Sequence, residues 1–197
     1  MSGGDPTIAI YDAQAGAYAA RNAELFELPQ AQAFAASLPT QALILDLGCG
    51  PGQYAGWFAA QGFRVEAWDG SSEMLALAEQ HDGVATRLAR FEDLSDAAAF
   101  DGIWANFSLL HAKRTDLSDL LTRIHHALTP SGVFHIAMKL GTGAGPDKIG
   151  RYYTYYGEAE LEDLLSAAGF KIMEKHLFDG VGLDGTAGHY ITLLCHG

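Results

Sequence analysis

The chain has 197 residues, 49% of them hydrophobic, and its 24 acidic and 12 basic residues give a formal net charge of −12. This hydrophobic fraction excludes an intrinsically disordered chain and suffices for the core of one ordinary domain. The excess of carboxylates disfavours nucleic acid as a partner, because binding to phosphates relies on clustered Lys and Arg. The composition favours small molecules, or a small region of a protein partner, as targets and leaves the oligomeric state open.

Neither a membrane segment nor a metal site is expected. No apolar run reaches the roughly 20 residues that span a membrane. The first residues, MSGGDPTIAI, lack the basic stretch and long apolar core of a signal peptide, so we expect a cytoplasmic protein. Cys49 and Cys195 are too few and too scattered for a disulfide framework or a zinc site, and the eight histidines show no metal-ligand spacing.

The N-terminal part of the chain is alanine-rich. Residues 11–26 (YDAQAGAYAARNAELF) favour a helix, and Pro29 and Pro39 interrupt the pattern after it. On such a helix Tyr11 and Tyr18, seven residues apart, share one face. They either pack on the edge of a sheet or form a lid over a ligand, and we favour the lid.

From residue 43 the chain alternates between strand and helix patterns. Strands are expected at 43–46, 63–69, 84–89, 100–106, 132–139, 171–178 and 189–195, the fifth of them after a turn at 129–132 (TPSG). Helices are expected at 53–61, 71–81, 115–128 and 158–170. Gly62 and Gly169 end the first and last of these helices, and Ser71 or Ser72 caps the second.

This alternation predicts an α/β fold. We expect a Rossmann-like, doubly wound, mostly parallel seven-stranded sheet with helices on both faces. The last two strands follow one another without a helix, so one of them is expected to run antiparallel. Ligands of such sheets bind at the carboxyl ends of the strands.

A glycine-rich loop follows the first expected strand. Asp46 stands two residues before the first of three glycines, Gly48, Gly50 and Gly52, and glycines at such a turn let a ligand approach bare backbone. A Walker phosphate loop requires a lysine after the last glycine, which is absent here. A dinucleotide loop has the spacing G-x-G-x-x-G, which fails because the sixth position is Gln53.

The sequence LDLGCGPG (45–52) resembles the first motif of class I S-adenosylmethionine-dependent methyltransferases, including small bacterial enzymes of the tellurite-resistance type. The resemblance extends over residues 42–139 and implies S-adenosylmethionine as the cofactor. It also implies that the loop cradles the methionine part and that Asp69 holds both ribose hydroxyls. The cofactor-binding residues implied in this way are Tyr11, Tyr18, Asp46, Gly48, Cys49, Gly50, Gly52, Asp69, Gly70, Ser71, Met74, Phe91, Glu92 and Asn106.

Two positions depart from patterns of the family. Arg90 stands where an acidic residue often takes the adenine amino group, so adenine is expected against the backbone of Phe91, with Glu92 or Asp93 supplying a carboxylate. Asn106 stands where amino-group methyltransferases of nucleic acids begin Asn-Pro-Pro-Tyr. The prolines and the tyrosine are absent here, which weighs against that subclass.

Candidates for acceptor chemistry are weaker, and no catalytic residue is assigned. His111 in the stretch SLLH is either a general base or a structural residue, and we favour the structural role. Residues 139–160 (KLGTGAGPDKIGRYYTYYGEAE) begin where the fifth strand ends. This loop, with Arg151 and Tyr155, either clamps a planar or anionic substrate or covers apolar surface, and we favour substrate contact.

We therefore expect a single methyltransferase domain over residues 1–197. Residues 1–40 would form a helical lid segment, 42–139 the cofactor-binding core, and 140–197 a substrate loop, a helix and two final strands. The expected function is methyl transfer from S-adenosylmethionine to a small-molecule acceptor by in-line displacement. The alternative is a non-catalytic S-adenosylmethionine-binding regulatory or partner protein, and a nicotinamide-dependent oxidoreductase is disfavoured by Gln53. The sequence leaves open whether oxygen, nitrogen, sulfur or carbon is methylated.

Overall fold

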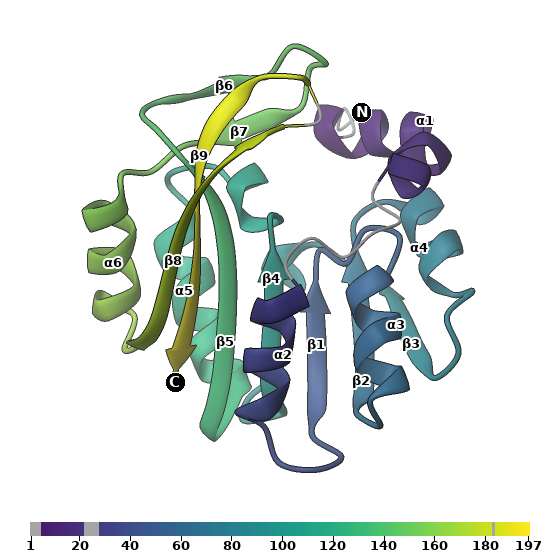
Figure 1. The fold of residues 1–197 in the computed structure, drawn as a ribbon, viewed down its shortest axis with the longest axis vertical. Coiled ribbons are helices and arrows are strands. Elements are labelled where there is room, and N and C mark those ends of the chain that lie inside the picture. Colours follow the sequence, from purple (N-terminus) through teal and green to yellow (C-terminus); the bar gives the residue numbers. More distant parts are fainter. Residues whose placement is uncertain (1–4, 22–27, 183) are drawn as a thin grey trace.

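The computed structural model describes residues 5–21, 28–182 and 184–197, and its centre is a seven-stranded sheet of order β3-β2-β1-β4-β5-β9-β8 (Figure 1). The strands of this sheet are β1 (Leu43–Leu47), β2 (Arg64–Asp69), β3 (Val84–Leu88), β4 (Phe100–Asn106), β5 (Leu128–Leu140), β8 (Lys171–Val181) and β9 (Ala187–His196). The α-helices are α1 (Pro6–Arg21), α2 (Leu28–Ala36), α3 (Gln53–Ala60), α4 (Ser72–Ala78), α5 (Leu117–Ala127) and α6 (Glu158–Ala167). Two single-turn 3₁₀ helices are η1 (Phe91–Asp93) and η2 (Leu109–His111).

The topology is the one that the alternating pattern predicts. Strands β3, β2, β1, β4 and β5 are parallel neighbours. Strand β9 lies antiparallel between β5 and β8, so the final strand in the sequence is the antiparallel one, as expected. The carboxyl ends of the parallel strands therefore meet at one edge of the sheet.

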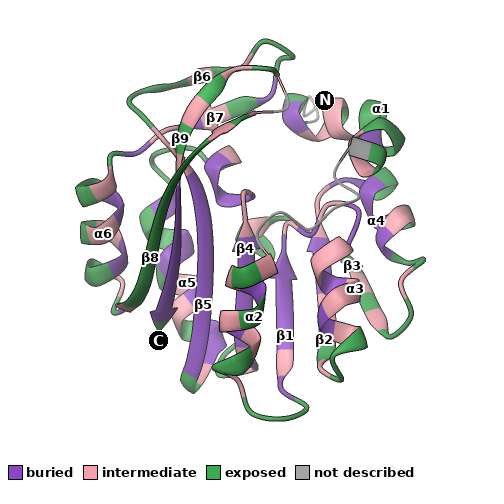
Figure 2. Ribbon diagram, in the orientation of Figure 1, coloured by how far each residue is buried: buried purple, intermediate pink, exposed green. Residues whose placement is uncertain are grey.

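Helices cover both faces of the sheet because its strands are apolar on both sides. Buried residues of α2, α3 and α4 pack with Ile44 and Trp104 on one face. Buried residues of α5 and α6 pack with the alternate positions Leu45 and Ile103 on the other face. The central strands consequently appear buried in Figure 2, whereas most of the edge strand β8 is exposed.

The N-terminal helices differ in extent from the sequence prediction. Helix α1 begins at Pro6 instead of residue 11, because the Asp5 side chain accepts a hydrogen bond from the Thr7 N–H (2.8 Å) and Pro6 suits the first helical position. The sequence prediction does not contain helix α2, because it interprets Pro29 as an interruption. Pro29 instead stands in the first turn of α2, where the N–H that proline lacks would have no partner within the helix. Residues 22–26 of the expected helix lie outside the described residues.

The C-terminal third also departs from the sequence prediction. The expected turn at 129–132 lies inside β5, at a jump in the β4–β5 register between Phe100 and Gly102. The expected loop 139–160 contains a separate antiparallel hairpin of β6 (Ala144–Pro146) and β7 (Tyr152–Thr154). Strands β8 and β9 are longer than predicted, and they rise with β6 and β7 beyond the carboxyl edge of the sheet (Figure 1).

Helix α1 is fixed over this edge through α4. Ser71 caps α4, as one of the two expected candidates, because its Oγ accepts a hydrogen bond from the Met74 N–H (3.1 Å). The same hydroxyl donates to Asp12 Oδ1 of α1 (2.6 Å). A side chain at Gly70 would collide with Ile8 of α1, whose Cδ1 lies 2.8 Å from the position of a Cβ.

Among the described residues, no helix is long and apolar enough to cross a membrane.

The three glycines of the loop between β1 and α3 meet different demands. All have positive φ, at 77° for Gly48, 53° for Gly50 and 80° for Gly52. A Cβ on Gly48 would lie 2.4 Å from Ser108 Cβ, and one on Gly52 would lie 2.8 Å from the Cα of Ala78 in α4. A Cβ on Gly50 would lie 3.9 Å from its nearest neighbour, Tyr18 Cε1, so this glycine alone of the three borders open space.

We predict that Gly52→Ala destabilises the fold more than Gly62→Ala. Both glycines have positive φ, but nothing lies within 4 Å of a Cβ at Gly62. Strain at positive φ should cost each variant about 1–2 kcal/mol. Overpacking against α4 should add about 1–3 kcal/mol for Gly52→Ala, which urea unfolding would measure. Equal free energies of unfolding would mean that packing against α4 does not require the glycine.

Candidate functional site

A large cleft of about 1450 Å³ lies over the carboxyl edge of the sheet, beneath α1 and the β6–β7 hairpin. Pockets for one drug-sized ligand typically measure roughly 300–1,000 Å³, so this cleft has room for two small molecules side by side. Every residue expected to bind the cofactor lines it except Gly52 and Ser71. These two support the cleft from behind, because Gly52 packs against α4 and Ser71 caps that helix.

Asp69, at the end of β2, is held rigidly at the rim of the glycine loop. Its Oδ2 accepts a hydrogen bond from the Gly50 N–H and its Oδ1 accepts one from the Ser71 N–H, both at 2.8 Å. Burial raises the pKa of Asp69, and these two N–H groups oppose that shift. A carboxylate oxygen can accept more than one hydrogen bond, so both oxygens keep capacity for hydroxyl donors of a ligand.

Asp46, at the end of β1, is a buried carboxyl group with an unused acceptor. The residue is 3% exposed, and its Oδ2 has no hydrogen-bond partner among the described residues. Burial, and then the charge of Asp69, raises the pKa of Asp46 to about 8. A buried polar atom without a partner is costly, so this oxygen is suited to a donor or cation that enters the cleft.

The structure distinguishes Glu92 from Asp93, the two residues next to Arg90 that are expected to supply a carboxylate to adenine. Asp93 Oδ2 accepts a hydrogen bond from the Arg90 N–H (2.8 Å) within its own turn, and Asp93 does not line the cleft. Glu92 does line it, with a carboxylate 4.0 Å from the exposed Arg90 guanidinium. Of the two acidic side chains, Glu92 is therefore the one in position to meet a ligand.

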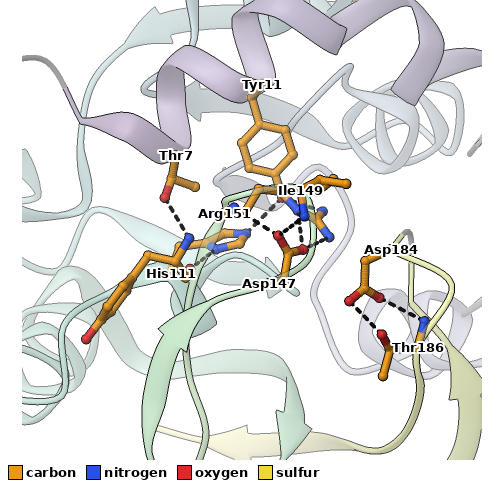
Figure 3. Close-up of polar contacts among 9 residues, drawn as sticks. Thr7, Tyr11, His111, Asp147, Ile149, Arg151, Asp184 and Thr186 are labelled. Carbon is orange, nitrogen blue, oxygen red and sulfur yellow. Dashed lines mark hydrogen bonds and ion pairs between the residues drawn. The ribbon is translucent and has the colours of Figure 1, made fainter.

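A hydrogen-bond network ties α1 to the β6–β7 hairpin (Figure 3). His111 Nδ1 lies 2.6 Å from the Tyr152 carbonyl, which can only accept, so this nitrogen carries the proton. Nε2 then accepts from the Tyr11 hydroxyl (2.8 Å), and that hydroxyl accepts from Arg151 Nη1 (3.2 Å). A further link runs from the Tyr152 N–H to Thr7 Oγ1 (3.0 Å).

These hydrogen bonds engage His111 and Arg151, two of the three weak candidates for acceptor chemistry. Both nitrogens of His111 are engaged within the protein, and burial lowers its pKa to about 4, so it is a weak base at neutral pH. Arg151 Nη2 pairs with Asp147 Oδ2 at 2.7 Å, and both side chains are only 4% exposed. The Arg151 guanidinium and the His111 imidazole thus tie α1 to the β6–β7 hairpin, whereas Tyr155 lines the cleft and is only partly buried.

Several cleft residues were not singled out from the sequence, although the expected substrate loop begins at one of them, Lys139. They come from the ends of β4 and β5 and from the β8–β9 hairpin: Phe107, Lys139, Phe178, Asp184 and Tyr190. Lys139 and Tyr190 are direct partners in the β5–β9 register, a pairing that no short-range pattern reveals. The described residues contain no group of three or more His, Cys, Asp or Glu side chains arranged to hold a metal ion.

Comparisons with known proteins agree with this geometry. Residues 44–132 match a family model described as a methyltransferase domain. The malonyl-[acyl-carrier protein] O-methyltransferase of Erwinia billingiae is 37% identical over 92 residues, which are 45% of this chain and 36% of that protein. The chain spans less than half the length of the curated relatives it matches.

Solved structures extend the similarity to nearly the whole chain. The 1,6-didemethyltoxoflavin-N1-methyltransferase of Burkholderia thailandensis, solved with 1,6-didemethyltoxoflavin and S-adenosylhomocysteine, is 27% identical with a TM-score of 0.75. The alignment covers 96% of this chain and 87% of that one. The [4+2]-cyclase SpnF, 18% identical with a TM-score of 0.66 over 85% of this chain and 80% of its own, shares the fold alone. The family model, the motif and the sheet topology together identify residues 44–132 as a methyltransferase domain of the class I, S-adenosylmethionine-dependent type.

Proposed function

We propose that this protein transfers a methyl group from S-adenosylmethionine to a small-molecule acceptor. The observation that carries the proposal is the pair of carboxyl groups, buried Asp46 and partly buried Asp69, on either side of the open Gly50 backbone. They lie in a cleft with room for a second molecule. A net charge of −12 further supports a small acceptor over nucleic acid.

The donor set of the cleft fits the proposed cofactor. A ribose diol and an ammonium group are hydrogen-bond donors, which require carboxylates or carbonyl oxygens. Asp69 would accept the two hydroxyls, since its oxygens are already aligned by Gly50 and Ser71. Asp46 Oδ2, which lacks a partner among the described residues, would accept the ammonium group. Gly50 leaves the space that the methionine part needs.

Held by Asp46 and Asp69, the cofactor would supply an activated methyl group: its bond to sulfur would break as the acceptor's nucleophile bonds to the methyl carbon, with the electron pair left on sulfur and the acceptor's proton lost to solvent. The protein positions the two molecules, an effect that accounts for roughly 7–11 kcal/mol in well-oriented reactions. Helix α1, with Tyr11 and Tyr18 in edge-to-face contact (ring centroids 5.5 Å apart), would exclude water above the reacting atoms.

Within this proposal the chain divides as the sequence suggests. The segment 1–40 contributes the lid helix, 42–139 holds the cofactor, and 140–197 supplies the acceptor side of the cleft. A protein that binds the cofactor without transferring its methyl group is the alternative. Transfer of radiolabelled methyl to a metabolite extract would distinguish the two, since a binding protein would give no labelled product.

We predict that Asp69→Asn weakens S-adenosylhomocysteine binding by about one to two orders of magnitude. Hydrogen bonds to a charged group are worth about 1.5–3 kcal/mol each, and the amide can accept through only one oxygen. Calorimetric titration would measure the change, with Asp163→Asn on the exposed face of α6 as the matched control. Unchanged affinity in a folded Asp69 variant would refute the assignment of the ribose site.

We predict that binding of S-adenosylhomocysteine at pH 7 releases protons from the wild-type protein. The pKa of Asp46 is about 8 in the free protein, so the group is mostly protonated at pH 7. An ammonium group favours the ionised carboxylate and lowers this pKa, which drives a proton off. Titration in buffers of different ionisation enthalpy should give up to about one proton for the wild type and none for Asp46→Asn. The idea fails if the two proteins release protons equally.

A further inference from the structure

Three side chains form a row across the end of the cleft that belongs to the C-terminal strands. Lys139 in β5 is the register partner of Tyr190 in β9, and Tyr190 is the partner of Phe178 in β8. Cross-strand partners project from the same face of a sheet, so these side chains are neighbours. The Phe178 and Tyr190 rings are stacked, with centroids 5.4 Å apart and planes 17° apart, and all three residues line the cleft.

Lys139 brings an unpaired positive charge to this row. Its ammonium group lies 6.0 Å from the ring centroid of Tyr155 and 5.9 Å from that of Tyr190. In the part of the chain that the structure describes, it makes no ion pair within 4.0 Å. Arg151, by contrast, is paired with Asp147, so Lys139 is the cation of the two that an incoming ligand can neutralise.

The acidic residue on this side of the cleft is directed into its own turn. Asp184 Oδ1 accepts a hydrogen bond from the Thr186 N–H (3.0 Å), and its Oδ2 accepts one from the Thr186 hydroxyl (2.8 Å; Figure 3). Lys139 is one of the charges that lower the pKa of Asp184, after the two bonds from Thr186. The turn therefore satisfies this carboxylate without a direct contact to the ammonium group.

Two further features mark the row as a surface made for a ligand. Phe107 has φ 55°, a strained conformation for an aromatic residue, and it directs its ring edge-on at Tyr190, with centroids 5.7 Å apart. The Tyr190 hydroxyl is buried and has no hydrogen-bond partner among the described residues. The backbone of Phe107 is thus held in an unfavourable conformation that places its ring against Tyr190, and the Tyr190 hydroxyl keeps unused hydrogen-bonding capacity next to the cleft.

We propose that the methyl acceptor is a small planar aromatic or heteroaromatic anion, held by Lys139 between the Tyr155 and Tyr190 side chains. This inference rests on the proposed methyl-transfer function and adds the chemical class of the acceptor. Aromatic side chains select a flat molecule, and the ammonium group selects a negatively charged oxygen. A nearby cation also lowers the pKa of an acceptor O–H, which then loses its proton to solvent before the oxygen bonds to the methyl carbon.

The test uses 1-hydroxy-2-naphthoate, a flat fluorescent anion, and 1-hydroxy-2-naphthamide, its uncharged counterpart, on protein saturated with S-adenosylhomocysteine. We expect the anion to bind at least about tenfold more tightly than the amide. Lys139→Gln should remove this preference by weakening the anion about tenfold and the amide less than about twofold. Lys171→Gln, an equal charge change at the exposed start of β8, should alter neither affinity.

A second variant tests the Tyr190 hydroxyl. Tyr190→Phe keeps the ring but removes the buried hydroxyl without a partner, so the unfolding temperature should rise while the affinity for the naphthoate falls. A merely structural tyrosine would not show these opposite changes.

Absence of S-adenosylhomocysteine binding would refute the proposed function itself. Normal S-adenosylhomocysteine binding with equal affinities for the two probes, or with no naphthoate binding, would overturn the acceptor class alone.

Discussion

The hydrogen bond from the Gly50 N–H to Asp69 joins the end of β1 to the end of β2, and the rest of the site is built on it. The same carboxylate accepts the Ser71 N–H, Ser71 caps α4, and the Ser71 hydroxyl holds Asp12 of α1. Asp69 thus fixes the shape of the loop and the start of α4, and Ser71 extends the connection to α1. A parallel sheet makes this possible because it brings all these strand ends to one edge.

Sequence patterns predicted the structure correctly where it depends on contacts between residues close together in the chain. Strand and helix periodicity, the glycine loop and the Ser71 cap all lie within short segments, and each agrees with the structure. Helix α2 was missed because a proline in a first helical turn and a proline in a loop have the same local signal. The row of Lys139, Tyr190 and Phe178 depends on the register of three strands, which is decided by tertiary packing.

Arg151 and Lys139 show why a positive charge in the sequence does not by itself identify an anion-binding residue. From the sequence, Arg151 next to a run of tyrosines suggested anion binding. In the structure its guanidinium is committed to Asp147, four residues earlier in the same tight loop, and to the Tyr11 hydroxyl. A buried ion pair of this kind is costly to break because it leaves one charge uncompensated. Arg151 therefore ties α1 to the β6–β7 hairpin, whereas Lys139 makes no ion pair within 4.0 Å among the described residues.

Helix α1 contacts both halves of the cleft, through Asp12 on the Asp69 side and through Thr7 and Tyr11 on the hairpin side. A ligand that stabilises the position of this helix through one side also stabilises the contacts that the helix makes on the other side. By thermodynamic linkage each of two such ligands then raises the affinity of its partner by the same factor. The helix would thus couple the two binding events energetically, so that neither molecule is held as firmly alone as in the presence of the other.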